Sequence, residues 1–177
     1  MDRKEFLRGC ATGLCACAAA CLPAGALTEP AGPDDWRLPF VKQRYAKLIA
    51  VLGEKMDAAS LTATLAELGA FCAAQQDSET KPFAGNIDAF SQKIAKYGSK
   101  VEHDAARNTY MVTYTPGADC FCPLNSLSAK TPGAVCDCSV GWARHTWTIL
   151  LGKEPKIALK EAVLRGGKAC RFEITPV

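Results

Sequence analysis

The segment Gly98–Thr115, GSKVEHDAARNTYMVTYT, decides the fold because the spacing of the apolar residues changes there. Upstream of it, apolar residues recur every three or four positions, which is typical of amphipathic helices. Within it they alternate with polar residues, as in a half-buried strand, and the apolar face consists of Tyr110, Val112 and Tyr114. Residues 100–104 and 109–115 are therefore predicted to form a hairpin. His103 lies near its turn and is interpreted as a solvated side chain rather than a ligand.

Two long helices are predicted before this segment. The first begins at Asp34 or Asp35, either of which can accept a hydrogen bond from an unpaired backbone N–H, and ends near Gly53. Its predicted buried face consists of Val41, Tyr45, Leu48 and Leu52. The second helix covers residues 57–76, and its predicted buried stripe consists of Leu61, Leu65, Leu68 and Cys72. Cys72 is therefore interpreted as a packing residue.

Two further helices complete the predicted helical content. After a polar connection over residues 77–82, Asn86 is expected to cap a short helix that reaches Tyr97. Downstream of the hairpin, residues 139–151 form a helix with Ser139 as its expected cap. Apolar residues surround this last helix on all sides, which predicts that it is largely buried.

The chain ends in a second pair of predicted strands. Residues 157–164 and 169–175 flank Gly166-Gly167, a dipeptide that favours a two-residue hairpin turn. Cys170 alternates with charged neighbours, so its side chain is expected on the apolar face. No internal repeat and no second-domain boundary is present in the sequence. The predicted fold class is α+β, with N-terminal helices packed on an antiparallel sheet, in a single domain over residues 35–177.

Composition and charge exclude some classes of partner. The chain has 177 residues, 49% of them hydrophobic, and a formal net charge of +3. Its length is sufficient for a folded core. The small charge and the lack of an evident basic stripe give no electrostatic reason to expect a nucleic-acid partner or a membrane-surface partner. The oligomeric state is not predicted by any feature of the sequence.

The N-terminus has the layout of an export signal. A basic start is followed by the weakly apolar run Gly9–Leu22 and by a small-residue site that ends at Ala26. The order Arg3-Lys4-Glu5-Phe6-Leu7 resembles the twin-arginine export signal with one arginine replaced by lysine. Residues 1–26 are thus predicted to be a signal peptide and residues 27–34 a tether. The protein is expected in the periplasm or cell envelope, and cleavage after Ala26 would remove four of the ten cysteines.

Two alternatives to a cleaved signal remain open. One is a lipid anchor, because Leu14-Cys15-Ala16-Cys17 resembles a weak lipoprotein-type box. The other is an uncleaved amphipathic helix. Apart from the signal itself or such an anchor, no membrane contact is expected. Export of an already folded protein by the twin-arginine route would allow a metal to be loaded where thiols are kept reduced.

Two Cys-x-Cys pairs stand out as a metal-binding pattern. Cys120 and Cys122 are separated from Cys136 and Cys138 by a thirteen-residue loop. In an extended segment residues two apart point to the same side, so each pair presents two sulfurs in one direction. We call these four residues the cysteine clasp and predict that it binds zinc, since four thiolates are the ligands of a closed structural zinc site. Alternative interpretations are an iron–sulfur cluster, two disulfides, or cysteines that are only buried.

A hydrolase is the second function considered. In that hypothesis Cys138 is a nucleophile and His145 its base, with His103 as an alternative base. A substrate carboxylate would be held by Arg144, Arg171 or Arg165, and Trp142 shares a helix face with His145. The helix that starts after Cys138 is expected to favour the ionised sulfur through its positive N-terminal end. No phosphate-binding loop, zinc-protease motif or serine nucleophile elbow is present.

The C-terminal forty residues add a family resemblance. Cys136-Asp-Cys-Ser-Val-Gly-Trp, the helix ending Leu151-Gly152 and the closing Gly-Gly-Lys-Ala-Cys170-Arg-Phe172 resemble the C-terminal half of the vinyl-reductase-type small-molecule-binding domain. They also resemble its relatives, the L-2-amino-thiazoline-4-carboxylic acid hydrolases. The resemblance implies an α+β domain whose sheet and helices enclose a pocket for a small-molecule ligand. It further implies that Cys138 and Cys170 match family cysteines, that some relatives bind zinc and that others open a thiazoline ring. The Cys120–Cys122 pair and the export signal are departures from the hydrolases.

Overall fold

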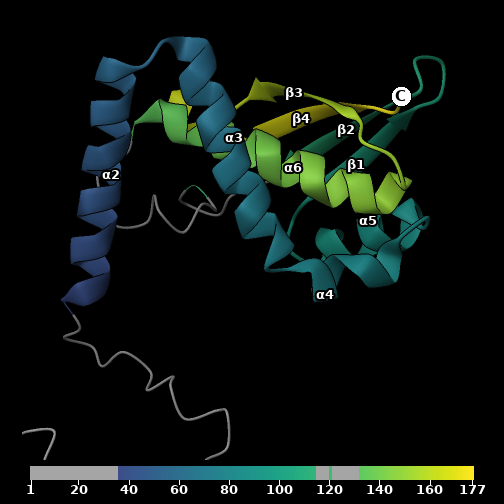
Figure 1. The fold of residues 1–177 in the computed structure, drawn as a ribbon. Helices are drawn as coiled ribbons and strands as arrows, with labels where there is room; N and C mark the ends of the chain where they lie inside the picture. The colour runs from purple at the N-terminus through teal and green to yellow at the C-terminus, as the bar shows by residue number, and fades with distance from the viewer. Residues whose placement is uncertain (1–35, 115–119, 121–131) are drawn as a thin grey trace, which may run out of the picture. The chain divides into compact units, whose positions relative to one another are not determined.

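The computed structural model describes residues 36–114, 120 and 132–177 (Figure 1). Its α-helices are α2 (Arg37–Lys55), α3 (Ala58–Ala74), α4 (Asp77–Thr80), α5 (Ile87–Ala95) and α6 (Cys136–Leu151), and its 3-10 turns are η1 (Lys81–Phe83), η2 (Gly133–Val135) and η3 (Val163–Arg165). The strands are β1 (Lys100–Asp104), β2 (Thr109–Tyr114), β3 (Lys156–Glu161) and β4 (Cys170–Thr175). None of the helices among the described residues is both long and apolar enough to cross a bilayer. The predicted signal peptide and tether, residues 1–34, lie outside the described residues.

The four strands form one antiparallel sheet in the order β1-β2-β4-β3. The two predicted hairpins are therefore joined in the middle, where β2 pairs with β4 and Tyr114 lies opposite Cys170. The first hairpin follows the prediction closely, and Asn108 adopts the positive φ of its turn. The α+β class, with helices packed on an antiparallel sheet, is confirmed.

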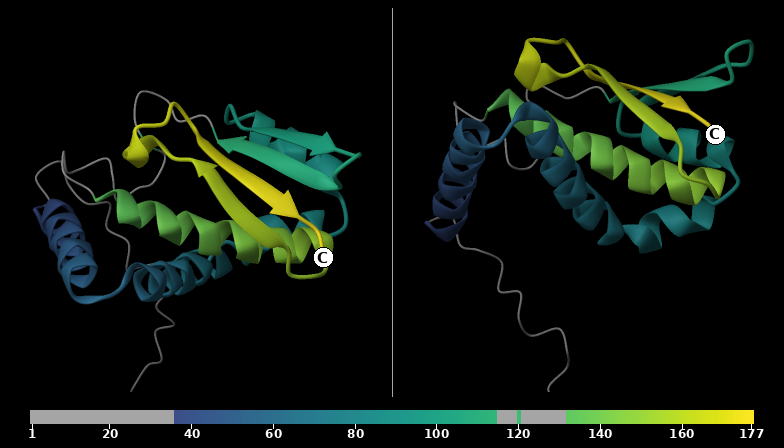
Figure 2. Two further views of the ribbon diagram at one scale, coloured as in Figure 1. Left: turned by 90° about the horizontal axis from the view of Figure 1, so that it is seen from above. Right: turned by 45° about the horizontal axis from the view of Figure 1, so that its top comes forward.

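Helix α6 lies between the sheet and α3, and two views show this layering (Figure 2). Its Trp147 and Ala143 are fully buried against the inner faces of β2 and β4 and against Phe90 of α5. The inner face of β4 comprises Cys170, Phe172 and Ile174, as the alternation predicts. A second core cluster joins α2, α3 and η2 through Ile49, Leu61, Leu65 and Val135.

Two glycines allow α3 and α6 to cross at very short distance. A Cβ on Gly141 of α6 would overlap the carbonyl oxygen of Ala66, and a Cβ on Gly69 of α3 would overlap the carbonyl oxygen of Cys138. Both glycines are helical, so their role is the close approach of the two backbones and not an unusual conformation. This contact fixes where α3 lies relative to α6.

The predicted buried face of α2 is wrong in part. Val41 is 57% exposed and Leu48 is 51% exposed, whereas Ile49 and Lys42 are the buried residues of the helix. The reason is that α3 and η2 contact only one edge of the apolar stripe. The helix also continues past Gly53 to Lys55, and Trp36 at its N-cap position makes no side-chain cap hydrogen bond.

The buried stripe of α3 is shifted from the prediction. Leu61 and Leu65 are buried, but Leu68 is 37% exposed and Cys72 is exposed, so the packing interpretation of Cys72 is wrong. The helix instead turns its small residues toward α6. Its N-terminal cap is Asp57, which accepts hydrogen bonds from two backbone N–H groups.

Three further boundaries differ from the prediction. The polar connection contains the helix α4, and α5 ends at Ala95, two residues before Tyr97. Asn86 caps α5 as predicted, by accepting a hydrogen bond from Ala89 N. The glycine pair does not form a two-residue hairpin, because η3 precedes it and Gly166 ends that turn in the left-handed conformation.

Candidate functional site

Three buried cysteines from different parts of the chain approach one another at one end of the sheet. Cys170 is the first residue of β4, opposite the last residue of β2, and Cys136 is the first residue of α6. Cys120 follows β2 in the chain. All three are more than 90% buried. We call Cys120, Cys136 and Cys170 the thiol cluster.

The electrostatics of Cys136 place the other two thiols near it. The pKa of Cys136 is raised to about 11, mainly by burial; the Arg165 guanidinium lowers it, and the Cys170 and Cys120 thiols contribute smaller increases. Cys136 therefore interacts electrostatically with both of the other thiols. Without a cation, Cys136 is therefore a neutral thiol at physiological pH. The expectation that the N-terminal end of this helix favours ionised sulfur fails for Cys136, because desolvation dominates.

Arg165 connects the thiol cluster to the start of α6. Its Nε donates to the carbonyl oxygen of Gly133 at 3.1 Å, and its NH2 group forms a 2.8 Å ion pair with Asp137. The other carboxylate oxygen of Asp137 accepts a hydrogen bond from Thr62 of α3 at 3.2 Å. The guanidinium is thus held beside the cluster by the backbone of η2 and by a carboxylate that is itself anchored.

The helix begins three residues earlier than expected, and this changes the geometry of one Cys-x-Cys pair. Cys136 and Cys138 both lie in the first turn of α6 rather than in an extended segment. Residues two apart in an α-helix point about 200° apart, so their sulfurs diverge. Cys138 lies among the α2 and α3 residues of the second core cluster, where its sulfur is 3.6 Å from the hydroxyl oxygen of Tyr45.

The cysteine clasp is incompletely described. Cys122 lies outside the described residues, so its position relative to Cys120 and Cys136 is not given. Among the residues that the structure describes, no three His, Cys, Asp or Glu side chains form a ready metal-binding group. The described cysteines also form no disulfide with one another.

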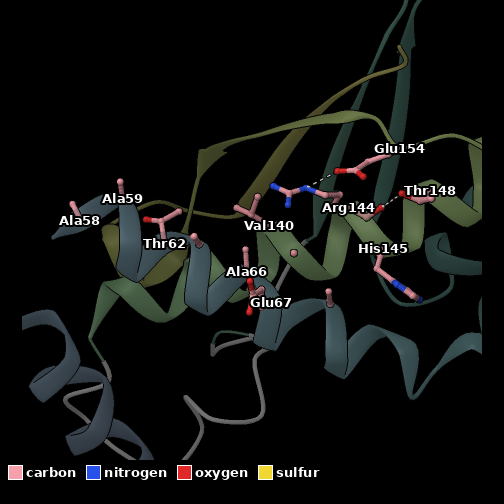
Figure 3. A pocket seen from close by; sticks show the side chains of 13 residues that line it. Ala58, Ala59, Thr62, Ala66, Glu67, Val140, Arg144, His145, Thr148 and Glu154 are labelled. Carbon is pink, nitrogen blue, oxygen red and sulfur yellow. Dashed lines mark hydrogen bonds and ion pairs between the residues drawn. The ribbon is translucent and has the colours of Figure 1, made fainter. Parts of the chain in front are cut away.

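A separate open groove of about 870 Å³ runs along α3 and α6. Small side chains of α3 form one wall, and Arg144 and His145 of α6 lie on the other (Figure 3). Arg144 points toward Glu154, with 3.7 Å between Nε and a carboxylate oxygen. Of the arginines predicted to hold a carboxylate, Arg144 thus lines this groove and Arg165 lines a second, smaller pocket beside Gly166 and Gly167.

The predicted dyad of His145 and Cys138 does not form. The two residues are seven positions apart on one helix, a rise of about 10 Å. His145 Nε2 is instead hydrogen-bonded to Asp77 of α4 at 2.7 Å, and this bond is the main cause of the lowered pKa of Asp77. Sequence reasoning missed Asp77, which lies in a segment expected to be only a connection.

The other predicted site residues are dispersed. Trp142 packs edge-on against Tyr114 in the core, and its backbone nitrogen faces Gly69. Arg171 is exposed on β4, beside Thr113 of β2. His103 is exposed and stacks on Tyr110 with 4.4 Å between ring centroids, in keeping with its interpretation as a solvated side chain. These side chains do not converge with Arg144 on one ligand.

The fold and these two sites define a class: an α+β domain with a central helix, a buried group of cysteines and an open helical groove. No protein-family model matches the chain, and no curated protein matches its sequence. The fold nevertheless has a counterpart among solved structures.

That counterpart is the crystal structure of a trafficking protein particle complex subunit 3 from Naegleria fowleri, covalently bound to palmitic acid. The TM-score is 0.54 at 13% sequence identity, over 78% of this chain and 94% of that chain. At this identity the similarity concerns the fold, which is α+β in both proteins.

Proposed function

We propose that the protein binds a metal ion, most suitably zinc, through cysteine thiolates at the end of the sheet. Cys120, Cys136 and Cys170 are the proposed ligands from the described residues. Cys122 is proposed as the fourth because it follows Cys120 by two positions. Cys138 fits the ligand set less well than Cys170 does, because its sulfur faces Tyr45 on the other side of α6.

The observation that supports this proposal most is the burial of Cys136 near Arg165, together with its electrostatic interaction with the buried Cys170 and Cys120 thiols. A thiol with a raised pKa is a poor nucleophile, which argues against a catalytic role for Cys136. A bound zinc ion favours the thiolate instead of the neutral thiol, since it displaces the thiol protons and neutralises the repulsion among the thiolates. Four thiolates leave no open coordination position, so the proposed role of the metal is to stabilise the fold. An iron–sulfur cluster is the alternative occupant.

The groove along α3 and α6 supports a second role, the binding of a small molecule. Arg144 lines it and is positioned to exchange its 3.7 Å ion pair with Glu154 for a bond to a ligand carboxylate. A small-molecule-binding role agrees with the resemblance to the vinyl-reductase-type small-molecule-binding domain. We propose that the protein performs it after export to the periplasm or cell envelope. A cysteine-dependent hydrolase that opens a thiazoline ring is less favoured, because Cys138 and His145 lie seven positions apart on one helix and do not form a dyad.

The ligand assignment is tested with single Cys→Ser variants of the full chain. Cys136→Ser and Cys170→Ser are expected to lose bound zinc, or the thiolate-to-metal absorption bands of a cobalt-substituted sample, and to melt at lower temperature. Cys72→Ser is the matched control, since Cys72 is exposed on α3, and it should keep both properties. Metal content unchanged in Cys136→Ser and Cys170→Ser would overturn the assignment, and loss in Cys136→Ser and Cys138→Ser but not in Cys170→Ser would favour the cysteine clasp over the thiol cluster.

A further inference from the structure

The N-terminal half of α2 exposes large apolar side chains that the other described residues leave uncovered. Residues 36–41 are all exposed. The large apolar residues of this region are between 46% and 68% exposed, and they are Trp36, Leu38, Phe40, Val41 and Leu48. Solvent-facing apolar residues of this number on one helix indicate a surface that binds something.

The apolar residues of α2 form a row along the helix, and a basic row lies beside it. Leu38, Val41, Tyr45, Leu48 and Leu52 follow one another at intervals of three and four, which places them on one face. Tyr45 and Leu52 pack against the second core cluster, so the exposed members of this row are Leu38, Val41 and Leu48. Arg37, Arg44 and Lys55 are separated by seven and eleven residues, close to whole numbers of turns. They therefore align along one edge of the apolar face.

The charge of α2 is far from the average of the chain. Residues 37–55 contain five basic residues and one acidic residue, whereas the whole chain has a net charge of only +3. Within the described part of the chain, Arg44, Lys47 and Lys55 form no salt bridge. The Arg44 guanidinium lies 5.3 Å from the Phe40 ring centroid, so a cation and an exposed aromatic ring are presented together.

This charge pattern selects between possible occupants of the surface. Pairing of α2 with the same helix of a second copy would bring together two helices that each carry five basic residues and one acidic residue, and like charges beside an apolar seam oppose association. An anionic lipid surface satisfies both rows, because the apolar side chains enter the acyl boundary while the basic ones pair with headgroups. We propose that α2 is an interfacial anchor that binds anionic phospholipid membranes, independently of the metal site.

The test is co-sedimentation of the full chain with vesicles of phosphatidylcholine alone or mixed with phosphatidylglycerol, at low and high salt. The wild-type chain should bind the anionic vesicles preferentially and less tightly as salt rises. Arg44→Gln and Lys47→Gln should each weaken partitioning about fivefold. Val41→Ser and Leu48→Ser should each weaken it about tenfold.

Matched substitutions outside the anchor serve as controls. Lys96→Gln removes an exposed lysine after α5, and Phe71→Ser removes an exposed ring from α3. Both should bind like wild type, and because every residue changed is at the surface, thermal melts should show intact folds. Equal binding to both vesicle types, or binding unaffected by the α2 variants, overturns the proposal. A dimer that is lost in Val41→Ser, in a chain that does not bind vesicles, overturns it in favour of a protein interface.

Discussion

At the scale of single residues, a competition between burial and charge decides the protonation state of Cys136. The nearby N-terminus of α6 and the Arg165 guanidinium favour a thiolate, but desolvation and two neighbouring thiols favour the neutral form, and they prevail. A cation in the thiol cluster would reverse that balance. The state of this one sulfur therefore reports whether the cluster is empty or loaded.

The first prediction concerns the metal-free protein at alkaline pH. The folded pKa of Cys136, about 11, lies above its ordinary value of 9.0. Its stabilising contribution is thus complete below pH 9 and is lost as pH rises toward about 11. Urea unfolding of chelator-treated protein should show that the stability advantage of wild type over Cys136→Ala shrinks across this interval, and Cys72→Ala should show no such trend. A difference that grows with pH would contradict the neutral thiol.

The second prediction concerns Arg165. Its guanidinium holds the backbone of η2 and Asp137 and lies near Cys136, so it is a positioning residue for the proposed zinc site. Arg165→Leu should weaken zinc binding by about tenfold to a hundredfold, the usual range for residues that support metal ligands. Competition with a chromogenic chelator measures this. Arg165→Lys should recover part of the affinity, and Arg107→Gln, which breaks a remote ion pair with Glu173, should have no effect. Equal affinities in all variants would exclude a role for Arg165.

At the scale of secondary-structure elements, the crossing of α3 and α6 is the contact that positions both sites. It forms the groove, which Thr62 also lines, and it brings Thr62 beside Asp137. The crossing depends on the absence of side chains at Gly69 and Gly141. Interhelical packing at this distance has no room to accommodate a methyl group.

The third prediction is a pair of glycine substitutions. Gly141→Ala forces the two backbones apart and should destabilise the protein by about 3 kcal/mol or more, at or beyond the upper end for overpacking. Gly53→Ala in α2 is the control, because its new Cβ would lie 3.7 Å from Leu61 in ordinary contact. It should stabilise the helix by roughly 0.5–1 kcal/mol. Chemical denaturation measures both, and a Gly141→Ala variant as stable as wild type would refute the close crossing.

The fourth prediction concerns the link between α4 and α6. Hydrogen bonds from His145 and then Lys81 lower the pKa of Asp77. A depressed carboxyl pKa contributes stability that is present above its ordinary value of 3.8 and is lost as pH falls through the folded value. Asp77→Asn should therefore reduce stability at neutral pH slightly and remove part of the loss of stability on acidification. Thermal melts between neutral pH and pH 3 would show an unchanged acid response if the contact were unimportant.

The sequence predicted the elements better than their mutual contacts. The first hairpin, the cap at Asn86 and the buried face of β4 follow from local periodicity and capping chemistry. The predictions that Val41 and Cys72 are buried were wrong, because apolar periodicity identifies the apolar stripe of a helix but not the element that covers it. The interaction of Cys170 with Cys136 depends on the packing of α6 against β4, which joins distant segments. No local pattern contains that information.

At the scale of the whole molecule, the proposed metal site and the proposed membrane anchor lie on different elements. The average charge of the chain gave no reason to expect a membrane surface, yet α2 carries five basic residues and one acidic residue beside its exposed apolar row. The thiol cluster lies instead at the end of the sheet where β4 begins, near the start of α6 and near Arg165 of η3. The two proposals therefore use different surfaces, and variants of one should leave the other unchanged.

The central claim is that the thiol cluster binds a metal ion. Elemental analysis of the protein purified without added metal, together with a count of titratable thiols after denaturation, tests it most directly. If the thiol cluster binds zinc, the protein contains about one zinc ion per chain. Its cysteine ligands then appear as titratable thiols when the protein is denatured with a chelator. A chain without metal in which four thiols are missing would contain two disulfides, and the metal-binding proposal would then be wrong.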